Sequence, residues 1–324
     1  MRASEARFAE FVATLGRGPG RSRALTRAEA REAFGMVLRG EVDRVQLGAF
    51  LMLLRYRGED ADEIAGLVEA AREHAGLPVE MGVALDWPSY GAGRTRGVPW
   101  FLLAALALAQ AGVPVLMHGT NRFSQGIGVA EALAALGVPV AANLGEATRQ
   151  IAQTGFAYLP LEALLPEANR LLELRALLGL RSPVNTVVRL LDPAGAPAGV
   201  DGVFHPAYLD VHLGVAKRLG RTRLVVLKGG GGEAERNPAK AAALHVWDGV
   251  RRSEVSLPPL SVPPPEPGDL ARFVEVWRGE VSEATVLATL AMALFAAGRA
   301  TPEEADARAA EIWAARGGLT KFAA

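Results

Sequence analysis

Three polar segments of the chain each follow an apolar run that predicts a β-strand. They cover residues 86–97, 118–124 and 228–236. Ligands of open parallel sheets bind beyond the carboxyl ends of the strands. Glycine, arginine, lysine and hydroxyl groups at such ends could bind a phosphorylated ligand, so these segments are the first candidates for chemistry.

In the first segment, glycines alternate with arginines just before a helix predicted to begin near Pro99. Backbone amides, guanidinium groups and a helix N-terminus together suit a phosphate. The alternative is a turn with two exposed arginines. The candidate phosphate-binding residues here are Ser89, Gly91, Gly93, Arg94 and Arg96.

The second segment places a polar cluster at the end of an apolar strand, and Gly119 belongs to its candidate binding residues. The side chains that could reach a ligand are His118, Thr120, Asn121, Arg122 and Ser124. His118 could instead satisfy a backbone carbonyl. No second histidine stands at the spacing of a metal site, which argues against zinc.

The third segment begins with Lys228 and four glycines, a loop whose backbone can approach a phosphate closely. It lacks the ending of a P-loop. Glu233 and Glu235 could hold magnesium, but carboxylates two residues apart point to opposite sides of an extended backbone. Solvated loop acids are the preferred interpretation.

Charge adds further candidates, although the whole chain has 35 basic and 35 acidic residues. Residues 170–252 hold 13 basic and 7 acidic residues, a net of +6. This segment predicts a basic face that could bind phosphates, and its candidates are Arg181, Arg189, Lys217 and Arg218. A solvated surface is the alternative.

Composition limits the class of protein. The chain has no cysteine, which excludes disulfides, thiol nucleophiles and cysteine–zinc sites and fits a reducing cytoplasm. The N-terminus lacks the apolar stretch of a signal peptide, and no apolar run is long enough to cross a bilayer. We therefore expect a cytoplasmic protein without a membrane partner.

The elements that position these segments follow from periodicity. Residues 4–75 predict short amphipathic helices, with Thr26 and Glu29 spaced as a capping box. Strands and helices then alternate, which predicts a largely parallel sheet covered by helices. The predicted fold class is α/β with a small all-α N-terminal domain.

Several of these motifs resemble a known family. They are Leu25-Thr26, Gly40-Glu41-Val42, residues 46–52, Gly58-Glu59, His118 to Arg122, residues 130–137 and residues 181–186. The chain resembles the anthranilate phosphoribosyltransferase-like proteins of glycosyltransferase family 3, with the nucleoside phosphorylase/anthranilate phosphoribosyltransferase-like fold. The resemblance implies a small helical domain for dimerisation (1–78 plus about 160–180) and a large α/β domain with the cleft (79–159 and 181–324). It also implies a homodimer through the N-terminal helices.

The sequence departs from that family at two sites. Residues 86–91 stand where the family has a GTGGD diphosphate loop, and Ala234-Glu235 stands where it has an Asp-Glu magnesium pair, leaving Glu235 as the metal candidate. The loop with Pro88-Ser89-Tyr90 and the loop at residues 228–233, followed by Arg236-Asn237-Pro238, resemble the YbiB-type paralogues. This resemblance implies a nucleic-acid-binding dimer associated with the DNA damage response.

The leading hypothesis is therefore a non-enzymatic or catalytically altered protein without a cofactor. It would bind DNA or RNA backbones, independently of sequence, through a basic groove containing the arginines and lysines above. On this hypothesis anthranilate phosphoribosyltransferase activity is not expected. The alternative is a pentosyl or phosphoribosyl transferase, or a phosphorylase, that acts on a small ring substrate with magnesium. His118, Asn121 and Ser89 would then orient the substrate, while Lys228 or Arg94 would hold the phosphate.

Overall fold

The computed structural model describes residues 2–322 except 19, 92–96, 121, 123 and 263–266. The predicted candidates Gly93, Arg94, Arg96 and Asn121 lie outside the described residues.

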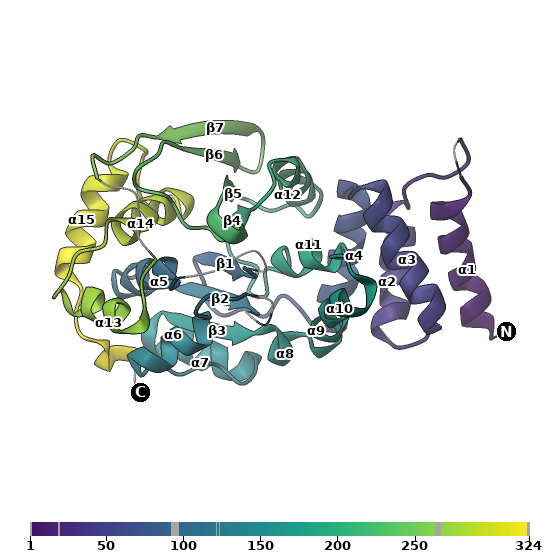
Figure 1. The fold of residues 1–324 in the computed structure, drawn as a ribbon, viewed down its shortest axis with the longest axis horizontal. Coiled ribbons are helices and arrows are strands. Elements are labelled where there is room, and N and C mark those ends of the chain that lie inside the picture. Colours follow the sequence, from purple (N-terminus) through teal and green to yellow (C-terminus); the bar gives the residue numbers. More distant parts are fainter. Residues whose placement is uncertain are drawn as a thin grey trace.

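The N-terminal helices form one end of the molecule (Figure 1). They begin at polar caps: the Thr26 side chain accepts from the Glu29 amide as predicted, and Asp43 and Asp60 cap the next two helices. Apolar faces from all four helices meet in one core, so the bundle depends on packing rather than on helix propensity. The helices are α1 (Ala3–Gly16), α2 (Arg27–Leu38), α3 (Arg44–Arg57) and α4 (Ala61–His74).

One carboxyl group inside this bundle is sensitive to pH. Glu63 of α4 is 2% exposed and accepts a 2.6 Å hydrogen bond from the Leu25 amide. Burial raises the pKa of Glu63 from 4.5 to about 7. As the pH rises from 4.5 to 7, Glu63 therefore ionises more readily in the unfolded chain than in the folded one. This difference favours unfolding.

We expect the free energy of unfolding to fall by about 3 kcal/mol between pH 4.5 and 7 because of Glu63, since each pKa unit corresponds to about 1.4 kcal/mol. Glu63→Gln keeps the acceptor for Leu25 and should remove this loss. Urea denaturation at pH 5 and pH 8 measures it, with the exposed Glu80→Gln as a control. An unchanged pH dependence in Glu63→Gln would show that Glu63 is not the cause.

The rest of the chain is built on a seven-stranded sheet with the order β3-β2-β1-β4-β5-β6-β7. The first five strands are parallel, and β6 and β7 add an antiparallel hairpin. The carboxyl ends of β1 to β5 therefore share one edge. The strands are β1 (Leu85–Ser89), β2 (Val115–Gly119), β3 (Phe156–Pro160), β4 (Ala198–Val203), β5 (Leu224–Lys228), β6 (Ala242–Trp247) and β7 (Arg252–Leu257).

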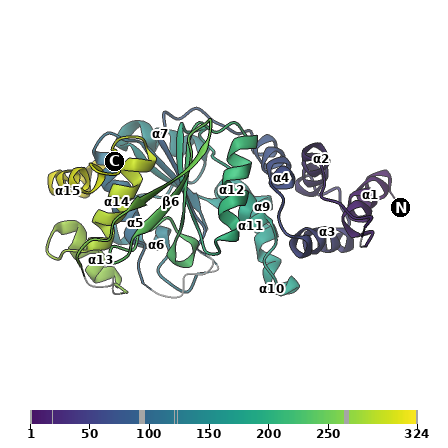
Figure 2. The same cartoon turned by 90° about the horizontal axis from the view of Figure 1, so that it is seen from above.

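Helices cover both faces of this sheet (Figure 2). Successive strand residues face opposite sides, so Leu116 packs in the core shared with the N-terminal bundle, whereas Val115 and Met117 pack in the core on the other face. The second core is formed with α5 (Trp100–Gln110), α6 (Val129–Leu136), α13 (Leu270–Arg278), α14 (Ala284–Ala296) and α15 (Ala305–Ala315). The first includes residues of α7 (Leu144–Thr154), α8 (Leu161–Leu164), α9 (Pro166–Glu173), α11 (Val184–Arg189) and α12 (Ala207–Arg218).

These layers confirm the predicted fold class, and the sheet is largely parallel as predicted, with one antiparallel hairpin at its edge. Within the described part of the chain, no helix combines the length and the hydropathy that a membrane span requires.

The first strand lies further along the chain than its sequence pattern predicts. Residues 86–89 were predicted to form a loop but belong to β1, which includes Pro88. Proline has no backbone N–H, so it cannot donate a hydrogen bond to a neighbouring strand, and it is therefore unusual in a central strand. It is tolerated because the pairing of β1 with β4 covers only Leu85 and Asp86. The polar segment therefore begins at Tyr90, four residues later than expected.

A buried chain of charges links the bundle to the sheet. Arg72 of α4 lies 3.3 Å from Asp192, which lies 3.4 Å from Arg221. Arg221 lies 3.3 Å from Asp86 of β1. Buried charges are stable only when they are paired, so α4 and the sheet share one electrostatic network.

Candidate functional site

The strand ends form one side of a cavity of about 360 Å³. Its other sides are residues that precede or belong to α11, the start of α12 and the segment between α3 and α4. The cavity thus lies between the sheet and the helical layer, at the edge where parallel sheets bind ligands. Its polar lining includes Arg55, Glu59, Arg175, Arg181, Asn185, Arg189, His205, Tyr208 and His212.

Arginines dominate this lining. Burial lowers the pKa of Arg181, and the nearby positive charges of Arg175, Arg189 and Arg55 lower it further. Crowded and half-buried guanidinium groups repel one another, and a bound anion would relieve that repulsion. Guanidinium groups match carboxylates and phosphates in geometry, so the cavity is suited to an anionic ligand.

Arg189, at the end of α11, holds strand β4 and two loops together. Its Nη1 donates to the carbonyls of Gly202 (3.1 Å) and Gly232 (2.9 Å), and its Nη2 donates to the carbonyl of Tyr90 (2.9 Å). Gly202 lies within β4, Tyr90 directly follows β1, and Gly232 lies in the loop after β5. Asp201 lies 3.4 Å from the same guanidinium. Arg189 therefore fixes the relative positions of the strand ends beside the cavity.

Glu59 brings a carboxyl group into this cationic cavity. Tyr208 donates to Glu59 Oε1 at 3.3 Å and accepts from Arg55 at 2.5 Å. Burial raises the pKa of Glu59, partly offset by the hydrogen bond from Thr186 and the charge of His212. A carboxylate with a raised pKa is a stronger base than an ordinary glutamate.

His118 lies deeper than its sequence context suggests. It is fully buried, its Nδ1 lies 2.9 Å from the Tyr90 hydroxyl, and its Nε2 lies 3.2 Å from Asp86. Gly119 beside it leaves no room for a side chain, because a Cβ there would lie 1.7 Å from the Ser89 carbonyl. His118 and Gly119 thus pack against Ser89 and Tyr90, at the end of β1 and directly after it, and do not line the cavity.

Only some of the predicted phosphate-binding residues lie at or near the cavity. Arg181 and Arg189 line the cavity, and Ser89 and Gly91 lie at the end of β1 beside the loop after β5. Thr120 is buried, Arg122 pairs with Glu173, and Lys228 is exposed at the end of β5.

Lys217 and Arg218 lie elsewhere. They lie at the end of α12, a helix of 12 residues that begins beside the cavity. The helix runs back toward the amino-terminal end of the strands, where β5 starts. Such a helix spans about 18 Å. Arg218 is paired with Asp62 at 2.5 Å. These two residues therefore do not extend the cationic cavity.

The residues present do not fit a magnesium ion held by protein carboxylates. Glu235 Oε2 accepts a 3.0 Å hydrogen bond from the Phe101 amide, and its neighbour Ala234 has no side-chain oxygen. Among the residues that the structure describes, no three His, Cys, Asp or Glu side chains form a metal-binding group.

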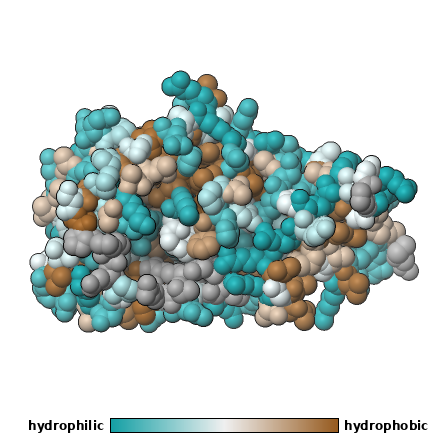
Figure 3. Space-filling view, turned by 45° about the horizontal axis from the view of Figure 1, so that its top comes forward, coloured by the Kyte–Doolittle hydropathy of each residue, from teal (hydrophilic) through white to brown (hydrophobic). Residues whose placement is uncertain are grey.

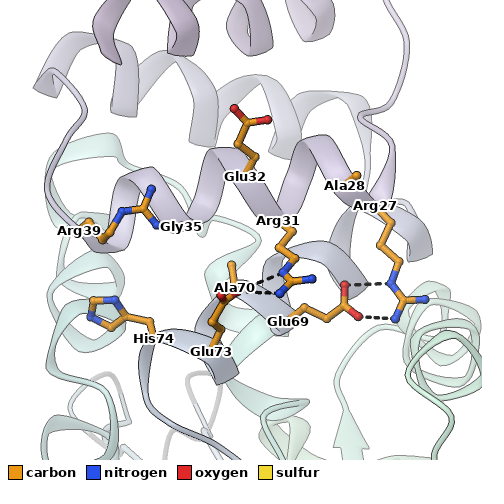
Figure 4. A pocket seen from close by; sticks show the side chains of 10 residues that line it. All are labelled: Arg27, Ala28, Arg31, Glu32, Gly35, Arg39, Glu69, Ala70, Glu73 and His74. Carbon is orange, nitrogen blue, oxygen red and sulfur yellow. Dashed lines mark hydrogen bonds and ion pairs between the residues drawn. The ribbon is translucent and has the colours of Figure 1, made fainter. Parts of the chain in front are cut away.

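A larger pocket of about 860 Å³ lies between α2 and α4 (Figure 4). The arginines that line it are matched by carboxylates: Arg27 pairs with Glu69 and Arg31 with Glu73. Paired surface charges offer an anion little, and no strand end reaches this pocket. The smaller cavity is therefore the candidate site.

Part of the positive charge in residues 170–252 is paired with carboxylates from other segments. Arg218 pairs with Asp62, and the buried Arg236 pairs with Asp306. Arg252 pairs with Asp210 within the segment. On the face in Figure 3, hydrophilic residues are interspersed with hydrophobic ones.

Comparison with known proteins gives a consistent family. Residues 9–75 match the helical bundle domain, and residues 93–266 the a/b domain, of a glycosyl transferase family. The anthranilate phosphoribosyltransferase of Methylobacterium nodulans is 33% identical over 81% of this chain and 77% of its own length. That of Methylorubrum extorquens is 32% identical over 93% and 94%.

Solved structures agree with these relatives. Anthranilate phosphoribosyltransferase from Thermus thermophilus superposes with a TM-score of 0.78 at 27% identity, over 95% of this chain and 94% of that one. The Saccharomyces cerevisiae enzyme in complex with PRPP and Mg has a TM-score of 0.74 over 96% and 94% at 17% identity, which shows the fold alone.

These findings contradict the predicted non-enzymatic nucleic-acid binder and favour the enzyme alternative. The prediction was wrong because it counted charges along the sequence, whereas folding pairs many of them. The homodimer and the resemblance to YbiB-type paralogues stay predictions.

Proposed function

This chain belongs to the glycosyl transferase family whose helical-bundle and a/b domains it matches, and from that premise we propose that it is a phosphoribosyltransferase. It would transfer a phosphoribosyl group from an activated ribose diphosphate to a small aromatic amine that carries a carboxylate. Anthranilate is the acceptor to test first, because the relatives are anthranilate phosphoribosyltransferases. The observation that carries the proposal is the cluster of four arginines and one carboxyl group in a cavity at the strand ends.

The cavity supplies what such a transfer needs. In the reaction, the amine nitrogen bonds to C1′ of the ribose while the bond from C1′ to the diphosphate oxygen breaks, and the diphosphate leaves with the electron pair. Guanidinium groups stabilise the acceptor carboxylate and the charge that develops on the leaving oxygens. The amine proton goes to the Glu59 carboxylate, whose pKa is raised by burial.

Turnover tests the proposal directly. The purified chain, given phosphoribosyl diphosphate, magnesium and anthranilate, should consume the acceptor and release pyrophosphate in equal amounts. A chain that releases no pyrophosphate with anthranilate or with related aromatic amines would contradict the proposed function. Release of a base from a nucleoside by inorganic phosphate would instead identify a phosphorylase.

Arg181→Ala is expected to raise KM for the acceptor by roughly 10- to 100-fold, the value of a hydrogen bond to a charged group. Arg181 is half-buried among positive charges and lines the cavity, so it should contact the acceptor carboxylate. Steady-state kinetics with each substrate varied measures this. The control is Arg251→Ala, which removes an exposed arginine on the β6–β7 turn. A change in KM for the donor alone would place Arg181 on the phosphate instead.

A further inference from the structure

A second carboxyl group lies at the strand ends, outside the cavity lining. Glu233 follows the glycine loop after β5 and is 1% exposed. Its Oε1 accepts a 3.2 Å hydrogen bond from the Ser89 hydroxyl at the end of β1. The side chain therefore crosses from the loop after β5 to the loop after β1.

Glycines make room for Glu233: Gly91 for its side chain, and Gly202 and Gly229 for its backbone. A Cβ on Gly91 would lie 2.3 Å from Glu233 Oε1, and a Cβ on Gly202 would lie 2.1 Å from the Glu233 carbonyl carbon. A Cβ on Gly229 would lie 1.6 Å from the Glu233 carbonyl oxygen. Such close backbone approach is what glycines at strand ends provide to a bound anion. Here a carboxylate of the chain itself occupies part of that space.

The same two loops are joined a second time. Arg189 donates to the carbonyls of Tyr90, after β1, and Gly232, after β5. The Ser89–Glu233 and Arg189 contacts therefore close the edge between β1 and β5 from two sides. A diphosphate entering this edge would meet the buried carboxyl group of Glu233, and a carboxylate repels a diphosphate strongly at close range.

We propose that Glu233 is an internal anion that occupies the phosphate-binding edge between the loops after β1 and β5, so that a diphosphate binds only by displacing it. The inference rests on the proposed function, because it takes the ligand of this edge to be the donor's diphosphate. Glu233 then sets the affinity for the donor and the release of pyrophosphate, without taking part in bond making.

Inorganic pyrophosphate tests the proposal without turnover. Isothermal titration of the full-length chain in magnesium buffer should show about tenfold tighter pyrophosphate binding in Glu233→Gln and Glu233→Ala, because a like charge leaves the site. Glu311→Gln removes an exposed carboxylate of α15 and should bind as the wild type does. Unchanged or weaker binding in folded Glu233 variants would overturn the proposal, as would the absence of binding in every protein.

If both variants fail to fold, hydrogen exchange on the wild type decides. Saturating pyrophosphate should increase amide exchange in residues 230–233, because the displaced side chain releases its loop. Unchanged or slower exchange there would overturn the proposal. Transfer activity is measured separately, so tight pyrophosphate binding without turnover would refute the proposed function while retaining the role of Glu233.

Discussion

Glu59→Gln is expected to lower kcat by about 10²- to 10⁴-fold, the usual contribution of a positioned general base. Glutamine keeps the size of the side chain and can still accept from Tyr208, but it cannot take a proton. KM for the donor should change little, because the diphosphate is held by cationic groups. Glu59 would then affect the chemical step rather than binding.

The pH profile makes this prediction specific. The base acts only when ionised, so the rate of the wild type should fall as pH decreases through the pKa of Glu59. Burial raises that pKa above its usual value, which places the acid limb at a higher pH than for an exposed glutamate. The groups facing it are Tyr208, Arg55, Thr186 and His212.

Single-turnover rates at several pH values test the assignment. The acid limb should disappear in Glu59→Gln and remain in Glu303→Gln, which removes an exposed carboxylate near α15. A Glu59→Gln enzyme with wild-type kcat and the same acid limb would show that another group accepts the proton.

Arg189→Ala should reduce kcat/KM by about 10²-fold or more, because small displacements of positioning groups can cost that much. It should also destabilise the fold by about 3 kcal/mol, since one partner of a buried pair is lost. The guanidinium binds carbonyls of strand β4 and of the loops after β1 and β5, and it faces Asp201. Without it the strand ends lose their common donor.

Arg189→Lys separates charge from geometry. A lysine retains the positive charge, but its ammonium group is a point charge without the planar fork that reaches several acceptors. We expect activity close to that of Arg189→Ala. Urea denaturation and steady-state kinetics on both variants measure the two effects. Full activity in Arg189→Lys would mean that charge alone is needed at this position.

The sequence predicted the layers of the fold because they follow from periodicity. It also predicted Arg181 and Arg189, although as contacts to nucleic acid. The error lay in the partners: the carboxylates that neutralise Arg218 and Arg236 are far away in sequence. A charge count along the chain cannot include pairs that only folding creates.

Other site residues carried weak signals or none. Gly58-Glu59 drew attention as a motif of the family, but not as a carboxyl group of the cavity. Tyr208 and His212 lie on α12 and reach the site through the crossover after β4. His118 looked like a ligand contact, and its burial depends on Tyr90 and Asp86 of the neighbouring strand.

The chain of charges from Arg72 through Asp192 and Arg221 to Asp86 limits how this molecule can flex. Separating any two of these partners would leave a buried charge without its counter-charge, which costs free energy. These ion pairs therefore hold α4 against the sheet, and we expect the two to move together. A movement that opens the cavity to substrate would therefore involve the segments around the cavity rather than a shift of α4 against the sheet.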